Sequence, residues 1–213
     1  MSKAVTRAVK RALVVGDMPF DSYQARPDEA VKNAARFLEE ARCGAVKLEW
    51  FAQCLEVTEK IIKAGIPVMG HIGLTPQTAA KQGGFRVQGK DAEAAERLIE
   101  QAIALERAGI FALVLECVPD KIAGLISGKL KVPVIGIGAG ADCDGQVLVL
   151  YDLLGLFERY TPKFVKKFIN LSPLILEAVE NFKSEVIAGK FPAPEHTFTM
   201  KEEEFKKLDE RQR

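Results

Sequence analysis

The sequence has little net charge, few cysteines and no long apolar run, and each shortage excludes a class of protein. Acidic and basic residues nearly cancel, leaving a formal charge of +1 over 213 residues, so no overall field attracts nucleic acid or an anionic membrane. The four cysteines show no C-x-x-C spacing, which disfavours a zinc site and favours free thiols in a reducing compartment. We therefore expect a cytoplasmic protein with no nucleic acid and no membrane partner, which binds small molecules or other protein chains.

The two ends of the chain predict surface segments. No apolar stretch near the start is long enough for a signal peptide or a membrane span. The opening MSKAVTRAVKRA predicts a basic surface helix, with a mitochondrial presequence as the alternative. Residues 199–213 alternate in charge and predict a solvated helix or a frayed tail. No linker divides the part before this tail, so we expect residues 1–198 to form one domain.

Five short runs rich in Val, Ile and Leu have the composition of strands that are covered on both faces. They are ALVVGDMPF (12–20), GAVKLE (44–49), PVMGHIG (67–73), FALVLECVP (111–119) and PVIGIGAG (133–140), with QVLVLYD (146–152) as a weaker sixth. Helical periodicity lies between or after them at 28–41, at 91–109 with Asp91 as N-cap, and at 172–189 with Ser172 as N-cap. This alternation predicts a parallel α/β sheet, either doubly wound or a (β/α)₈ barrel, although six strands are two short of a barrel.

Ionisable residues stand at the carboxyl ends of four of these runs: Asp17, Glu49, His71 and Glu116. In parallel α/β proteins this edge carries the active site, so the four groups are expected to face one pocket. Each has a purely structural alternative, since an acid can cap a helix or pair with a lysine and a histidine can be satisfied inside a core. Glu116 fits that alternative least well, because an unpaired carboxylate within an apolar run is costly to bury.

These residue types suit one kind of chemistry when taken together. Asp17 and Glu49 supply the oxygen ligands that Mg²⁺ prefers. Lys47 lies two residues before Glu49, hence on the same side of its strand, and can meet an anionic substrate. Glu116 is the candidate general base. A metal-bound 2-oxo acid that loses a proton from its α-carbon is one reaction that uses all of these groups.

Seven segments resemble, in the same order and with similar spacing, the ketopantoate hydroxymethyltransferase family over roughly residues 4–198. They are VVGDMPFDSYQ, AVKLE, GIPVMGHIGLTPQ, GGFRVQGK, LVLECVP, VPVIGIGAGADCDGQVLV and FPAPEHTF. The resemblance implies a (β/α)₈ TIM barrel of the phosphoenolpyruvate/pyruvate type in a homo-oligomer, which is a decamer in the family. It also implies a Mg²⁺-dependent transfer of a hydroxymethyl group from 5,10-methylenetetrahydrofolate to 3-methyl-2-oxobutanoate, giving 2-dehydropantoate for pantothenate and coenzyme A biosynthesis.

The resemblance also implies a role for each strand-end residue. By its position, Asp17 resembles the family's ligand for both the metal and the oxo acid, and Lys47 resembles its contact to the substrate carboxylate. Glu49 resembles an acid that binds the metal directly or through another group. Glu116 resembles the proton acceptor, with His71 as a second catalytic residue in the same pocket.

The sequence departs from the family pattern in two places. Family members begin with two further βα units, the second of which ends in a VGDS motif with a metal-binding aspartate; this chain starts inside what corresponds to the second helix. The acid of VKLE is usually followed by two glycines, whereas Trp50 and Phe51 stand here, and their rings predict a crowded pocket or a different turn of the loop. Two alternatives therefore remain: an impaired or inactive relative that serves as an oligomeric scaffold, and a lyase of the phosphoenolpyruvate mutase and isocitrate lyase group.

Overall fold

A computed structural model describes residues 1–212 of the chain, without the side chains of Lys81 and Gln82. The described chain divides into two compact units. The first consists of Met1–Leu148 with Lys163–Val165, and the second of Val149–Pro162 with the residues from Lys166 onward. The predicted domain of residues 1–198 spans both units, and its extent stays a prediction.

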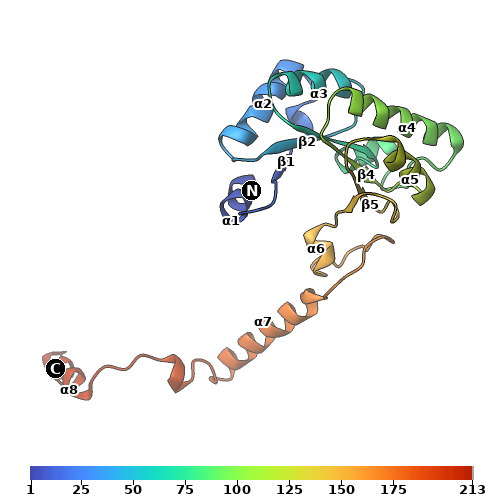
Figure 1. The fold of residues 1–213 in the computed structure, drawn as a ribbon. Helices are drawn as coiled ribbons and strands as arrows, with labels where there is room; N and C mark the ends of the chain where they lie inside the picture. The colour runs from blue at the N-terminus through green and yellow to red at the C-terminus, as the bar shows by residue number, and fades with distance from the viewer. Residues whose placement is uncertain (213) are drawn as a thin grey trace. The chain divides into compact units, whose positions relative to one another are not determined.

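The first unit is built on a parallel sheet whose six strands follow the order of the chain (Figure 1). The strands are β1 (Val15–Asp17), β2 (Ala45–Glu49), β3 (Val68–Gly73), β4 (Ala112–Glu116), β5 (Val134–Ile137) and β6 (Gly145–Gln146). Each strand pairs with its neighbour in sequence, as in the wall of a (β/α) barrel, whereas a doubly wound sheet reverses its order at a switch point. The predicted α/β class is confirmed, and the described sheet is an open one of six strands rather than a closed barrel of eight.

Helices connect the strands of the first unit. Before the sheet lies α1 (Ser2–Ala8), and the connections contain η1 (Phe20–Ser22), α2 (Pro27–Glu39), α3 (Cys54–Lys63), η2 (Pro76–Gln82), α4 (Ala92–Arg107) and α5 (Asp120–Lys129). The predicted helices at 28–41 and 91–109 are confirmed as α2 and α4, and the Asp91 side chain accepts a hydrogen bond from Ala94 N at 2.8 Å. Right-handed crossovers that all step the same way place α2 to α5 on one face of the sheet, as Figure 1 shows for α2, α3 and α4.

Alternation along the strands separates an apolar face from a polar one. Leu48, Ile72 and Leu115 are at most 1% exposed, and they point toward the helices because they alternate with the polar residues of their strands. The helices contribute the buried side chains of Ile61, Leu105 and Ile126 to the same core. The other face of β1 to β4 is therefore free to carry the ionisable residues.

The second unit and its connection to the sheet differ in part from the sequence prediction. The sixth predicted strand, 146–152, is wrong beyond its start, because β6 ends at Gln146 and Leu150–Leu153 forms α6. Among the described residues β6 pairs on one side only, with β5, so no second neighbour holds the segment extended. The predicted helix at 172–189 is α7 (Leu171–Ile187), but its N-cap is Asn170 rather than Ser172. The chain continues through η3 (Pro194–His196) to α8 (Glu202–Gln212), which has no buried residue, like α1.

Replacing Gly73 by alanine is expected to destabilise the first unit by more than the replacement of Gly65. Both glycines have positive φ, +92° and +83°, so each alanine costs about 1–2 kcal/mol in conformational strain. A Cβ on Gly73 would also collide with the backbone oxygen of Glu116, whereas among the described residues no neighbouring atom lies within 4 Å of a Cβ on Gly65. Overpacking of this kind adds about 1–3 kcal/mol. Urea unfolding of the two variants measures the difference, and equal losses would contradict the close approach of β3 and β4.

Candidate active site

The strand register places the ionisable residues in one row across the carboxyl ends of β1 to β4. Asp17 lies opposite Lys47, and Glu49 lies opposite His71. Glu116 ends β4 opposite Gly73, the last residue of β3. Residues paired in register have side chains on the same face of a sheet. The predicted convergence of the four strand-end groups and Lys47 is therefore what the register produces.

Lys47 is the central contact of this row. Its Nζ atom lies 2.9 Å from Oδ1 of Asp17 and 3.2 Å from Nδ1 of His71. The lysine side chain is 17% exposed, whereas that of Asp17 is 55% exposed. A mostly buried ammonium group beside an open carboxylate leaves room for a second anion, such as a substrate carboxylate, to reach the cation.

His71 is held neutral and in one tautomer. Burial lowers its pKa, an effect that the neighbouring Glu116 carboxylate opposes. Because Lys47 has only donors to offer, the Nδ1 atom that it contacts must accept, and the proton of the neutral ring then resides on Nε2. The buried Nε2 atom lies 3.3 Å from Oε2 of Glu116. Among the described residues, however, Nε2 makes no hydrogen bond. His71 thus presents an N–H group to the same space as the Glu116 carboxylate.

Glu49 is the most deeply buried carboxylate of the row. The residue is 2% exposed, and burial raises its pKa from 4.5 to about 7, against the opposing effects of the Lys47 charge and of a hydrogen bond from Gln77. The backbone N–H of Gln77 donates to Oε2 at 3.1 Å, and Oε1 lies 3.8 Å from Nδ1 of His71. Near neutral pH this group is therefore divided between its acid and its carboxylate forms.

Replacing Glu49 by glutamine is expected to stabilise the metal-free protein at pH 8 but not at pH 4. A carboxyl whose folded-state pKa is raised contributes full stability below its unfolded value of 4.5, and that contribution falls as pH rises to about 7. The neutral glutamine avoids this loss, which is at most about 3 kcal/mol. Urea unfolding at both pH values, with a chelator present, measures the effect. The exposed Glu59→Gln is the control, and a stability difference independent of pH would contradict the shift.

Sequence reasoning does not single out three further residues of this region as site residues. Gln77 follows a proline in the loop after β3, and its side chain contacts Tyr23 Oη at 3.3 Å. Tyr23 is 1% exposed, and burial raises the pKa of its phenol. Cys117, directly after Glu116, has a φ of +51°, which is unusual for a residue other than glycine. Only the position of Cys117 beside a strand-end acid points to the site.

Trp50 and Phe51 lie beside the row rather than within it. Alternation directs Trp50 away from the face that carries Lys47 and Glu49, and its ring lines small surface pockets with residues of α4. The Phe51 ring packs edge-on against Tyr23, with 5.5 Å between ring centroids. Both rings also pack against the hydrophobic core. The loop after β2 therefore places both rings against the core and outside the row of ionisable residues.

The residues of the row fit a divalent cation by the chemistry of their donors. Asp17 has a largely exposed carboxylate, and Oε1 of Glu49 is free of the Gln77 hydrogen bond that Oε2 accepts. Mg²⁺ is commonly held by one or two carboxylates, with waters and substrate oxygens completing its coordination. Across residues 1–212, no group of three or more His, Cys, Asp or Glu side chains gathers as a metal site. Asp17 and Glu49 are the two carboxylates that the row offers to such a cation.

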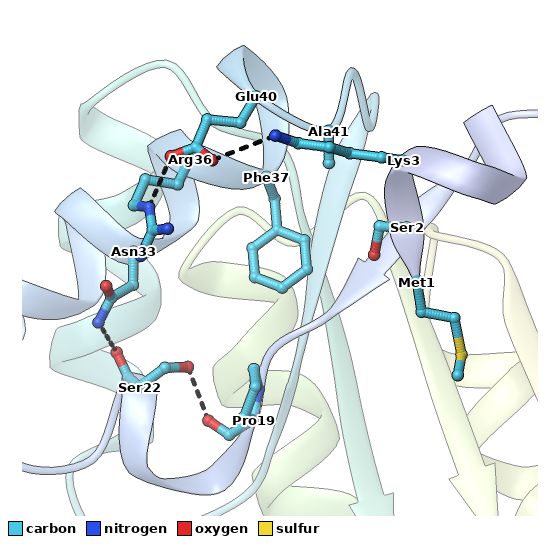
Figure 2. Close-up of a pocket in the computed structure, with 10 residues that line it drawn as sticks. All are labelled: Met1, Ser2, Lys3, Pro19, Ser22, Asn33, Arg36, Phe37, Glu40 and Ala41. Atoms are coloured by element: carbon cyan, nitrogen blue, oxygen red, sulfur yellow. Dashed lines mark hydrogen bonds and ion pairs between the residues drawn. The ribbon is translucent and has the colours of Figure 1, made fainter. Parts of the chain in front are cut away.

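A separate surface pocket lies between α1, the loop after β1 and α2 (Figure 2). Its volume is about 390 Å³, and the Phe37 ring points into it. Glu40 Oε1 binds Arg36 at 2.7 Å and Oε2 contacts Lys3 at 3.5 Å, so Arg36 and Lys3 share one carboxylate. None of the strand-end groups lines it.

Comparison with known proteins identifies the family. The family model described as ketopantoate hydroxymethyltransferase matches residues 1–194. The 3-methyl-2-oxobutanoate hydroxymethyltransferase of Syntrophomonas wolfei subsp. wolfei is 58% identical over 97% of this chain and 75% of its own length. The protein of the same name from Syntrophobacter fumaroxidans is 54% identical over 97% of this chain and 73% of its own length.

The similarity to solved structures concerns the fold only. A crystal structure of a phosphonopyruvate hydrolase matches all of this chain and 74% of its own with a TM-score of 0.50, at 13% sequence identity. Along the described residues, no helix combines the length and the apolarity that crossing a bilayer requires. Since the family model matches residues 1–194 and the relatives share more than half of their aligned residues with it, the chain belongs to the ketopantoate hydroxymethyltransferase family.

Proposed function

We propose that this enzyme transfers a hydroxymethyl group from 5,10-methylenetetrahydrofolate to 3-methyl-2-oxobutanoate, giving 2-dehydropantoate for pantothenate and coenzyme A biosynthesis. The chain is similar to proteins named hydroxymethyltransferases, and the family is one of enzymes that transfer a one-carbon group. In the overall reaction one water is consumed: the methylene carbon leaves tetrahydrofolate, its new bond is to C3 of the oxo acid, and water supplies the hydroxyl group.

One observation carries the proposal: Lys47 and Glu116 approach opposite nitrogens of the same imidazole, that of His71. An oxo acid whose carboxylate is bound at Lys47 would extend past His71 toward Glu116. The Glu116 carboxylate is then positioned to accept the proton from C3, which makes that carbon the nucleophile for the methylene group. Before this step, the Nε2–H group of His71 is available to donate a hydrogen bond to the Glu116 carboxylate and so to orient it.

Asp17 and Glu49 are the residues that would hold Mg²⁺. When bound there, the cation would supply Lewis-acid polarisation of the ketone, which makes the neighbouring C–H bond more acidic. The protein itself contributes the two carboxylates and the Lys47 ammonium group, whose Nζ atom lies 2.9 Å from Oδ1 of Asp17.

Proton abstraction and group transfer can be measured separately. In D₂O, the chain with Mg²⁺ and 3-methyl-2-oxobutanoate should exchange the C3 hydrogen for deuterium, which ¹H NMR detects without folate. Addition of 5,10-methylenetetrahydrofolate should then yield 2-dehydropantoate. Exchange without product would limit the activity to enolisation, and the absence of both would contradict the proposal.

We also propose that the chain forms homo-oligomers. Among the described strands β1 pairs only with β2, and a strand edge that is left unpaired promotes association. In the second unit, α7 exposes Leu174, Ile175, Leu176, Val179 and Phe182. Light scattering across a concentration series should give a mass above 23.4 kDa, reduced in Val179→Glu but not in Glu177→Gln. A monomer at every concentration would contradict self-association.

The compartment and the fold subtype are proposals as well. All four cysteines are free thiols, which suits a reducing compartment, and we place the enzyme in the cytoplasm on this ground. The chain-order sheet supports a (β/α) barrel, and we propose the phosphoenolpyruvate/pyruvate type because the chain belongs to the ketopantoate hydroxymethyltransferase family.

A further inference from the structure

Gln77 joins three parts of the candidate active site. Its backbone N–H donates to Oε2 of Glu49 at 3.1 Å. Its side chain donates from Nε2 to the carbonyl oxygen of Met18 at 3.1 Å and accepts, at Oε1, a hydrogen bond from the Tyr23 hydroxyl at 3.3 Å. The oxygen and the nitrogen of the side-chain amide therefore each make a hydrogen bond, and the backbone N–H of the same residue makes a third.

The partners of Gln77 are themselves fixed. Met18 directly follows Asp17 and is fully buried, and its N–H donates to the carbonyl oxygen of Lys47 at 3.2 Å. Tyr23 is buried and packs against Phe51. The side chain of Gln77 is thus tied to the end of β1 through a buried residue that neighbours Asp17.

Hydrogen bonds between the threonines on either side of Gln77 also hold the turn that carries it. The hydroxyl groups of Thr75 and Thr78 lie 2.6 Å apart, and the Thr78 N–H donates to the Thr75 carbonyl at 2.9 Å. Pro76 restricts φ between them. The backbone N–H of Gln77 consequently has little freedom to leave the Glu49 carboxylate while the side chain stays bound.

We propose that Gln77 is a positioning residue that holds the Glu49 carboxylate in a fixed place relative to Asp17. The two carboxylates come from neighbouring strands. Gln77 links them, because its backbone N–H binds Glu49 and its side chain binds the carbonyl of Met18, the residue that follows Asp17. The ligand to which they are presented, a divalent cation with a 2-oxo acid, rests on the proposed function. The positioning itself rests on the contacts of Gln77 alone.

Three substitutions separate positioning from packing. Gln77→Met keeps the length of the side chain but removes both of its hydrogen bonds, and Tyr23→Phe removes one of them. Gln53→Met changes an exposed glutamine and is the control. Two quantities are measured after urea unfolding has shown that each variant folds: the hydrogen-exchange rate of the residue-77 backbone amide in metal-free protein, and Mn²⁺ binding by electron paramagnetic resonance.

Gln77→Met is expected to accelerate exchange at amide 77 by about tenfold or more and to weaken Mn²⁺ binding by a similar factor. Without the two side-chain hydrogen bonds, the backbone N–H of residue 77 can leave the Glu49 carboxylate. Tyr23→Phe should change the exchange rate and Mn²⁺ binding in the same direction but by smaller factors. If Gln77→Met does not fold, Tyr23→Phe provides the test instead. Unchanged exchange would overturn the positioning role, and faster exchange with unchanged Mn²⁺ binding would overturn its link to the site. If the unaltered chain binds no Mn²⁺ while amide 77 responds as expected, the metal part of the proposed function fails and the positioning of Glu49 stands.

Discussion

Replacing Glu116 by glutamine is expected to lower the rate of hydroxymethyl transfer by about 10²- to 10⁴-fold, the usual contribution of a general base. Glutamine has nearly the same shape but cannot accept a proton from carbon. The Glu116 side chain is 14% exposed, so a bound substrate can reach it, and the change buries no unpaired charge. The variant should therefore fold normally and still bind the oxo acid.

The deuterium-exchange assay locates this loss in the chemical step. Glu116→Gln should abolish exchange at C3 of 3-methyl-2-oxobutanoate, while calorimetry shows oxo acid binding within a few-fold of the unaltered protein. Glu100→Gln, at an exposed position on α4, is the control. Exchange that persists in Glu116→Gln would show that another group removes the proton, and loss of binding would show that Glu116 acts as a ligand instead.

The strand-end groups are predictable from the sequence because each one interrupts or ends an apolar run. Parallel strands of an α/β sheet bring their carboxyl ends to one edge, so Asp17, Glu49, His71 and Glu116 converge whichever way the sheet is wound. The winding itself is not encoded in such a local pattern. Six runs fit either a doubly wound sheet or a barrel wall, and only the pairing of each strand with its sequence neighbour decides between them.

The features that the sequence does not predict depend on long-range contacts. Gln77 is a single amide in a loop, and its bond to Met18 spans 59 residues, so no spacing reveals it. Residues 120–129 form α5 although Gly124 and Gly128 lower helix propensity, because burial of Ala123 and Ile126 against the sheet stabilises the helix. The raised pKa of Glu49 likewise follows from burial that only the folded chain provides.

Replacing Lys47 by methionine is expected to reduce kcat/KM for the oxo acid by about 10²- to 10³-fold, with a large part of the effect in KM. The substitution removes the cation that meets the substrate carboxylate, and a buried charge-assisted contact is worth this factor. It also leaves Asp17 without its 2.9 Å partner and Nδ1 of His71 without a donor. Because the Lys47 charge lowers the pKa of both Glu49 and His71, both pKa values should rise in the variant.

The methyl ester of the oxo acid tests whether Lys47 acts through the substrate carboxylate. The unaltered enzyme should bind the acid much more tightly than the ester, because only the acid offers an anion to the ammonium group. Lys47→Met should lose this preference and bind the two compounds about equally, whereas Lys60→Met, at an exposed lysine on α3, should keep it. If Lys47→Met weakened acid and ester by the same factor, the lysine would act only by ordering Asp17 and His71. A preference retained in full would assign the carboxylate to a different cation.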